Sequence, residues 1–184
     1  MIYTILFEKG LDKEARIVKN VLKKVYGIKC IEKEDDLSGV VRYDKKLGGN
    51  VVRRTKMFRN HIALTKKELF AYGAKSRKDD WIFGYSTDKK YFTISVKRLK
   101  SNPALYKERL ESIAVHELGH SLVKRTKHYK MFVWKDEKTG HRLVLGMHCP
   151  DKRCVMAQTV DLRELDKQLR IIYKGYFCKK CRPR

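Results

Sequence analysis

The chain has 184 residues and a mass of 21.8 kDa, which is enough for one domain with its own hydrophobic core. Its 44 lysines and arginines against 21 acidic residues give a formal net charge of +23, but 42% hydrophobic residues exclude a disordered basic tail. No apolar run approaches the roughly 18–20 residues that cross a bilayer, so we expect a soluble, cytoplasmic protein without a membrane partner.

The first third of the chain has the pattern of a strand, a helix and a second strand. Residues Ile2–Glu8 alternate loosely between apolar and polar side chains, and Leu11–Tyr26 places its apolar residues at helical spacing. Ile28–Ile31 follows as a short strand, so the order predicts an α/β or α+β sheet. The glycine-containing, highly charged stretch Val40–Arg59 is expected to form an exposed loop or an extended excursion.

The middle of the chain is expected to add strands to this sheet. His61–Leu64 is a short apolar run, and the capping-box pattern that follows it predicts a brief helix over Thr65–Phe70. Trp81–Ser86 and Tyr91–Leu99 have the composition of two strands joined by a tight connection.

The next helix carries a pattern of metal-binding residues. The pair Asn102–Pro103 predicts the start of a helix that continues to about Val123. Within it, His116 and His120 are four residues apart, so both imidazoles project from one face and can bind one ion. Glu117 is offset by about 100° from His116, which is too far to be a natural third ligand but suits a base acting on a metal-activated water.

A second group of metal-binding residues lies near the C-terminal end of the chain. Clustered thiols in a reducing compartment indicate metal binding, and four thiolates are the number that a closed structural zinc site needs. A helix predicted over Asp161–Tyr173 separates two pairs of cysteines and would bring them together. The four residues are Cys149, Cys154, Cys178 and Cys181.

These residues together resemble the archaemetzincins, a family of metzincin-type zinc metallopeptidases. The family pattern runs His-Glu-x-x-His-x-x-Gly-x-x-His-Cys, four residues, Cys, one residue, Met, a spacer, and Cys-x-x-Cys. Its first part is matched by the helix motif, and the later positions are matched by His148, Cys149, Cys154, Met156, Cys178 and Cys181.

The chain departs from the family pattern at one point. Val123 and Thr126 stand where the family has its Gly and third His, and the matching His148 comes 22 residues late. We interpret residues 124–147 as an insertion that splits the motif, with a β-hairpin of strands Met131–Trp134 and Arg142–Leu145. The expected organisation is one metallopeptidase domain, 1–184, composed of 1–123 with the sheet and active-site helix, the inserted hairpin 124–147, and a C-terminal subdomain 148–184.

Three histidines compete for the role of third ligand. His148 is preferred because its neighbour Cys149 would be fixed by the structural zinc. His128 would lie about 80° round a straight helix from His120 and roughly 12 Å along it, so we reject it. His141 falls at the expected hairpin tip, far from the helix.

The resemblance implies a fold, a cofactor set and a reaction. The fold is α+β: a twisted mixed sheet above the active-site helix, with a C-terminal helical four-cysteine zinc subdomain and one strand, within Tyr91–Leu99, that pairs with an extended peptide. The cofactors are two Zn²⁺ ions, one catalytic and one structural. Glu117 acts as the general base in hydrolysis of a peptide or protein substrate, and Met156 forms the structural Met-turn beneath the imidazoles.

Two other functions fit the composition. Three separate segments, 42–59, 123–153 and 163–184, each carry a net charge of +6, which suits a nucleic-acid or acidic partner. The same fold can also be a catalytically silent zinc protein, if the insertion blocks the cleft.

Overall fold

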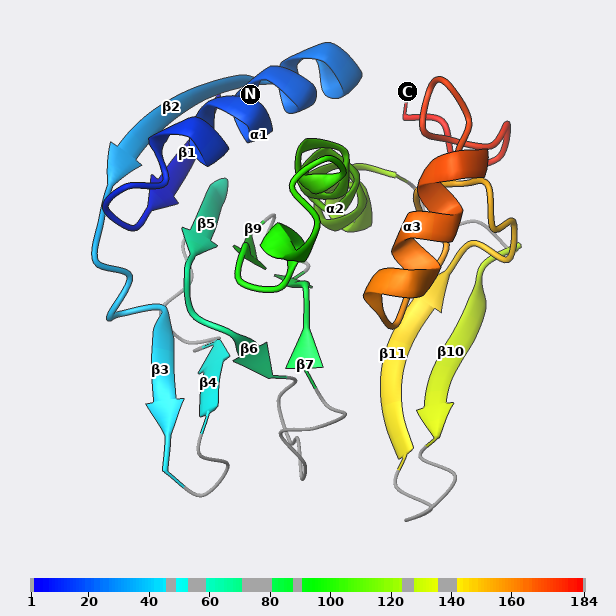
Figure 1. The fold of residues 1–184 in the computed structure, drawn as a ribbon. Helices are drawn as coiled ribbons and strands as arrows, with labels where there is room; N and C mark the ends of the chain where they lie inside the picture. Colours follow the sequence, from blue (N-terminus) through cyan, green and yellow to red (C-terminus); the bar gives the residue numbers. More distant parts are fainter. Residues whose placement is uncertain are drawn as a thin grey trace.

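The protein has an α+β fold in which helices cover one face of a twisted sheet, as the sequence predicts (Figure 1). None of the helices in the described part of the chain is long and apolar enough to cross a membrane. The computed structural model describes residues 2–45, 49–52, 59–70, 81–87, 91–123, 128–135 and 142–183.

The main sheet contains five strands in the order β2-β1-β5-β9-β8. Four of them run parallel, and β8 pairs antiparallel with β9 at one edge. The predicted strand, helix, strand opening is confirmed, because helix α1 (Asp12–Tyr26) connects the parallel neighbours β1 and β2. The strands are β1 (Ile2–Phe7), β2 (Lys29–Glu34), β5 (His61–Thr65), β9 (Tyr91–Ser95) and β8 (Gly84–Thr87).

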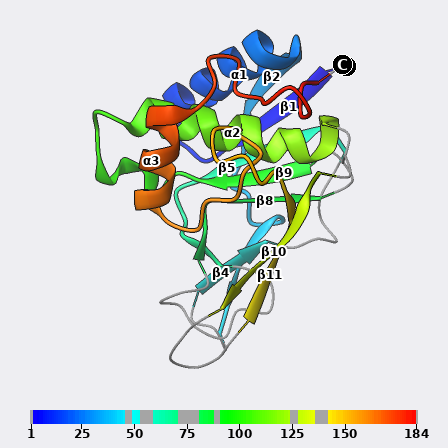
Figure 2. The same ribbon diagram turned by 90° about the vertical axis from the view of Figure 1, so that its right-hand side faces the viewer.

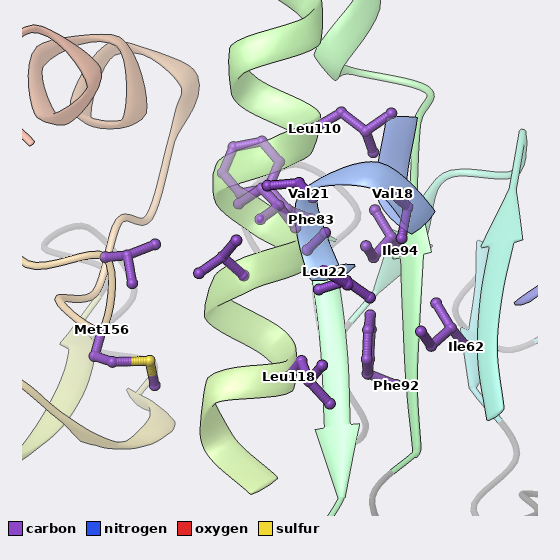
Figure 3. Packing of buried hydrophobic residues seen from close by; sticks show 14 of the residues in the cluster. Val18, Val21, Leu22, Ile62, Phe83, Phe92, Ile94, Leu110, Leu118 and Met156 are labelled. Atoms are coloured by element: carbon purple, nitrogen blue, oxygen red, sulfur yellow. The ribbon is translucent and has the colours of Figure 1, made fainter. Parts of the chain in front are cut away.

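The core lies between this sheet and the helices α1 and α2 (Tyr106–Leu122). Successive side chains of a strand point to opposite faces, so Tyr3 and Ile5 of β1 join the helix-side cluster while Leu6 joins a smaller cluster on the other face. Figure 3 shows Phe92 and Leu118 close together in the helix-side cluster. Helix α2 is therefore held against the sheet by apolar burial.

A second, four-stranded sheet extends the molecule. Its order is β3-β4-β6-β7, and it includes parts of the stretch Val40–Arg59, which was expected to form an exposed loop or an extended excursion; the described parts are extended strands. Residues 53–58 of that stretch, with residues 46–48, lie outside the described part. The strands are β3 (Val41–Asp44), β4 (Gly49–Val52), β6 (Leu69–Phe70) and β7 (Trp81–Ile82).

The brief helix predicted over Thr65–Phe70 is wrong. The Thr65 hydroxyl accepts a hydrogen bond from the Lys67 backbone N–H, which closes a short turn, and the Glu8 carboxylate takes the N–H of Lys66. Leu69 and Phe70, the two residues of β6, are almost fully buried. Burial of this apolar pair between two strands outweighs the local capping signal.

Helix α2 (Tyr106–Leu122) begins later than the sequence suggests and ends where it predicts. The Asn102 side chain accepts the Ala104 N–H as expected of a cap, but turns and a 3-10 helix (Leu99–Ser101) precede the first α-helical residue. Val123 has extended backbone angles, so the helix does not run on toward Tyr129. The chain can therefore change direction directly after the His-Glu-x-x-His segment.

A two-stranded antiparallel hairpin follows, formed by β10 (Lys130–Lys135) and β11 (Arg142–His148). It extends away from α2 toward the end of the molecule where β3 and β4 lie (Figures 1 and 2). The strands lie where the sequence predicts them, while residues 136–141, which include the connection and His141, lie outside the described part. Because Lys130 pairs with His148, the end of β11 lies beside the start of β10, close to the end of α2.

Helix α3 (Leu162–Ile171) is joined to α2 by an ion pair whose arginine is buried and whose aspartate is partly exposed. Asp161 caps α3 by accepting the Glu164 N–H. Arg109 of α2 donates two hydrogen bonds, at 2.8 and 2.7 Å, to the two carboxylate oxygens of Asp166. The Arg109 side chain is only 3% exposed, and it also donates to the carbonyl of Leu99.

Removing the carboxylate of this pair should destabilise the protein strongly. In Asp166→Ala, a buried guanidinium loses its charge partner, so we expect a loss near the lower end of about 3–5 kcal/mol in the free energy of unfolding, measured by urea denaturation. Lys107→Ala removes an exposed i,i+4 pair with Glu111 and should cost at most about 1 kcal/mol. Equal losses in the two variants would contradict this account.

Candidate active site and metal centres

Three histidines from two distant segments meet beside α2. His116 and His120 lie one turn apart on the helix, and His148 is the last residue of β11. Their potential ligand atoms all lie within 4.8 Å of one another, and the ring centroids are 4.8–5.2 Å apart. The structure thus brings together the three residues expected to bind the catalytic metal.

The orientation of the rings suits a metal ion. His116 Nδ1 lies 2.7 Å from the Val155 carbonyl oxygen, so this nitrogen donates its proton and leaves Nε2 as a ligand. His116 Nε2 and His120 Nε2 are 3.1 Å apart. Two imidazole nitrogens on one tetrahedral zinc would be about 3.3 Å apart, so the pair fits a shared ion.

Burial keeps two of these imidazoles neutral. It lowers the pKa of His116, and it lowers the pKa of His148 to about 3, with the nearby His116 adding to the effect. A neutral imidazole is the form that binds metal, so these rings need not lose a proton at neutral pH before they can act as ligands.

Glu117 is buried between α2 and the edge strand β8. Burial raises the pKa of its carboxyl to about 8, and a hydrogen bond from Ser86 opposes the shift. A Cβ atom at Gly84 would lie 2.5 Å from Glu117 Oε1, so only glycine leaves room for the carboxylate at this point of β8. The absence of a side chain at Gly84 and the hydroxyl of Ser86 together fix the position of the carboxylate.

Met156 lies on the side of α2 that faces away from the sheet (Figure 3). Its side chain is fully buried, and a Cβ atom at Gly119 would collide with its sulfur. Gly119, inside the His-Glu-x-x-His segment, therefore allows the methionine to approach the helix closely next to His120. The role of Met156 beneath the imidazoles stays a prediction.

The C-terminal cysteines form a second cluster. Cys149 Sγ lies 3.8 Å from Cys178 Sγ, and the Cys154 Sγ accepts a hydrogen bond from the Cys178 backbone N–H. Burial raises the pKa of Cys149, whereas a hydrogen bond from the Cys181 thiol lowers the pKa of Cys154. Ionised thiols this close together would repel one another, and a bound cation would remove that repulsion, so the cluster suits a metal ion.

Sequence reasoning missed one member of this cluster. His128 Nε2 lies 3.4 Å from Cys149 Sγ and 3.3 Å from Cys181 Sγ, and the potential metal-binding group in the described part of the chain consists of His128, Cys149, Cys178 and Cys181. His128 was rejected for the catalytic site on the assumption of a straight helix, but α2 ends before it. The signal that could have found it is the hairpin, whose pairing brings the start of β10 beside the end of β11.

The chain is similar in sequence to proteins called archaemetzincins. It is 34% identical over 110 residues to one from Sulfolobus acidocaldarius, covering 55% of this chain and 46% of that one. It is 30% identical over 122 residues to another from Methanopyrus kandleri, covering 65% and 51%. This chain thus spans about half the length of the curated relatives that it matches. No protein-family model matches it.

Two solved structures share the fold along nearly the whole chain. The archaemetzincin from Archaeoglobus fulgidus, complexed with malonate, has a TM-score of 0.66 at 20% identity and 98% coverage of both chains. A zinc-dependent peptidase from Methanocorpusculum labreanum has a TM-score of 0.63 at 17% identity and 97% coverage of both.

Removing the imidazole contributed by the hairpin should empty the histidine cluster. His148→Ala leaves only the two ligands on the helix. After dialysis that removes unbound zinc, we therefore expect metal analysis to find about one zinc ion fewer per chain than in the wild type. His61→Ala provides the control, because His61 lies in β5 beside the Arg59 carbonyl and belongs to neither metal-binding group. Full zinc retention by His148→Ala would rule out the predicted third ligand.

Proposed function

The chain is related to the archaemetzincins in sequence and in fold, and from this premise we propose that it is a zinc-dependent metallopeptidase that hydrolyses peptide bonds. The observation that carries the proposal is the convergence of His116, His120 and His148 beside a buried carboxylate. Three protein ligands leave a fourth position on a tetrahedral ion open, which is the arrangement of catalytic rather than structural zinc sites.

The histidine cluster would hold the catalytic ion, and the cysteine cluster would hold a second, structural one. A zinc ion bound by the three imidazoles supplies a Lewis acid and lowers the pKa of water at the open position. At the second site, predicted from Cys149, Cys154, Cys178 and Cys181, protein ligands fill every position, so the ion would stabilise the fold only.

Glu117 would act as the general base. Its carboxylate takes a proton from the attacking water and returns it to the nitrogen of the leaving amine. The buried position raises the pKa of Glu117 to about 8 without a metal, and a neighbouring cation would lower it toward neutral pH. A base whose pKa is close to the working pH is well suited to accept and then return a proton.

Substrate is expected to pair with the edge strand β8. The earlier expectation of a peptide-binding strand within Tyr91–Leu99 is wrong, because β9 is paired with β5 on one side and with β8 on the other. Within the described strands, β8 has no neighbour on its other side. An extended peptide added there would pass next to Glu117, since Gly84 and Ser86 of β8 both contact that side chain.

Neutralising the carboxylate should abolish hydrolysis without removing the metal. Glu117→Gln keeps the shape of the side chain but cannot accept the proton, so we expect kcat/KM to fall by about 100-fold or more. The measurement is peptide-library cleavage followed by mass spectrometry, with zinc content determined in parallel.

Glu111→Gln is the matched control for this variant. Glu111 lies on the same helix, where it contacts Lys107 and Tyr176 instead of the histidine cluster. The control should cleave at the wild-type rate. Undiminished turnover by Glu117→Gln with zinc bound would contradict the proposed base.

Adding one methyl group to β8 should misplace the same carboxylate. In Gly84→Ala, the new Cβ would lie 2.5 Å from Glu117 Oε1, so the side chain must move. A displacement near 1 Å can cost about 100-fold in rate, and we expect this loss in kcat with zinc content unchanged. Gly39→Ala has open space around its Cβ and should leave kcat unchanged. Wild-type kcat in Gly84→Ala would show that the position of Glu117 does not limit the reaction.

A further inference from the structure

His128 enters the cysteine cluster from the base of the hairpin. It lies just before β10, whose residue Lys130 pairs with His148 of β11. This register places His128 beside the residues that follow His148, and its Nε2 atom lies within hydrogen-bonding distance of the sulfurs of Cys149 and Cys181. Its ring also contacts the ring of the buried Tyr129, at 4.9 Å between centroids.

The distances in this cluster match those between ligands of one zinc ion. A nitrogen and a sulfur bound to a tetrahedral zinc would be about 3.5 Å apart, and two sulfurs about 3.8 Å apart. His128 Nε2 is 3.4 Å from Cys149 Sγ and 3.3 Å from Cys181 Sγ, and the sulfurs of Cys149 and Cys178 are 3.8 Å apart. The imidazole thus occupies a position that a fourth ligand could take.

Cys154 occupies another such position. Its sulfur accepts the Cys178 backbone N–H and lies beside the thiols of Cys178 and Cys181, but it is not part of the group formed with His128. Its backbone is fixed independently, because the buried Gln168 of α3 donates to the Cys154 carbonyl at 2.9 Å. Five donors therefore surround a site that a zinc ion fills with four.

We propose that His128 is a ligand of the cysteine zinc site and can occupy its fourth position in place of Cys154. Cys149, Cys178 and Cys181 form the common part of the site, and either the imidazole or the fourth thiolate completes it. This inference rests on the structural zinc of the proposed function and goes beyond its four-cysteine ligand set. Through His128 and Cys149, the metal would hold both strands of the hairpin at their bases.

The test compares single and double variants of the two interchangeable ligands. Each is made in full-length His120→Ala protein, in which the catalytic cluster is weakened, so that bound zinc reports on the cysteine site. X-ray absorption at the zinc edge separates sulfur from lighter ligands and identifies an imidazole nitrogen by scattering from the outer ring atoms, and competition with a chelator gives the affinity. Circular dichroism verifies folding, and Cys30→Ser is the control for loss of a cysteine outside the cluster.

The proposal predicts a specific pattern of ligand shells. Cys154→Ser should keep its zinc with three sulfurs and one nitrogen, and His128→Ala should keep its zinc with four sulfurs. In the double variant, the affinity for zinc should fall by more than the roughly 10- to 100-fold that is typical when a residue hydrogen-bonded to a metal ligand is removed.

Three results would overturn the inference. Loss of zinc from Cys154→Ser to the same extent as from the double variant would show that His128 is not a ligand, and so would a Cys154→Ser shell without nitrogen. A parent protein without sulfur-bound zinc would reject the structural site itself, and the inference with it. Peptide hydrolysis by the wild-type chain is measured separately, so that failure of the peptidase proposal can be distinguished from failure of the inference about His128.

Discussion

Two neighbouring residues, His148 and Cys149, point into different clusters at the end of β11, and the arrangement of both candidate metal sites depends on them. Successive side chains of an extended chain face opposite sides, so one backbone segment presents an imidazole to α2 and a thiol to the C-terminal cysteines. The Cys149 N–H donates to the Met156 carbonyl at 2.9 Å, which fixes this segment to the loop beneath α2. Disturbing the cysteine site should therefore also move the third imidazole.

The loop that follows Cys149 holds α2 at two further points. The Val155 carbonyl orients His116, and Met156 packs against Gly119 within the same helical turn. On the opposite side of the helix, apolar side chains and Gly84 of β8 fix the position of Glu117. The predicted ligands and the proposed base are thus held by separate elements, which reduces the cost of organising a catalytic site.

Much of this arrangement could be predicted because its signals are local. Helical spacing identifies α1 and α3, and the i,i+4 histidines identify one face of α2. The paired spacing of the cysteines indicates a metal site, although their ligand roles and that of His148 stay predictions. The hairpin strands β10 and β11 were also recognisable from two apolar runs that flank a turn-like segment.

The features that were missed depend on distant partners. Thr65–Phe70 has a helix-cap pattern, but Leu69 is buried between two strands that come from elsewhere in the chain. Likewise, His128 is remote from the cysteines in sequence and reaches them only through the pairing of β10 with β11. The position of β9 inside the sheet was also missed, because the order of all the strands decides whether a strand lies at an edge or between two neighbours.

Anomalous diffraction at the zinc edge from crystals of the wild-type chain tests the central claim most directly. The account predicts a peak bound by His116, His120 and His148 at about 2.0–2.1 Å, with no protein atom at the fourth position. It also predicts a separate peak among the C-terminal sulfurs. A histidine cluster without a peak in zinc-saturated crystals, or a fourth protein ligand closing that site, would contradict it.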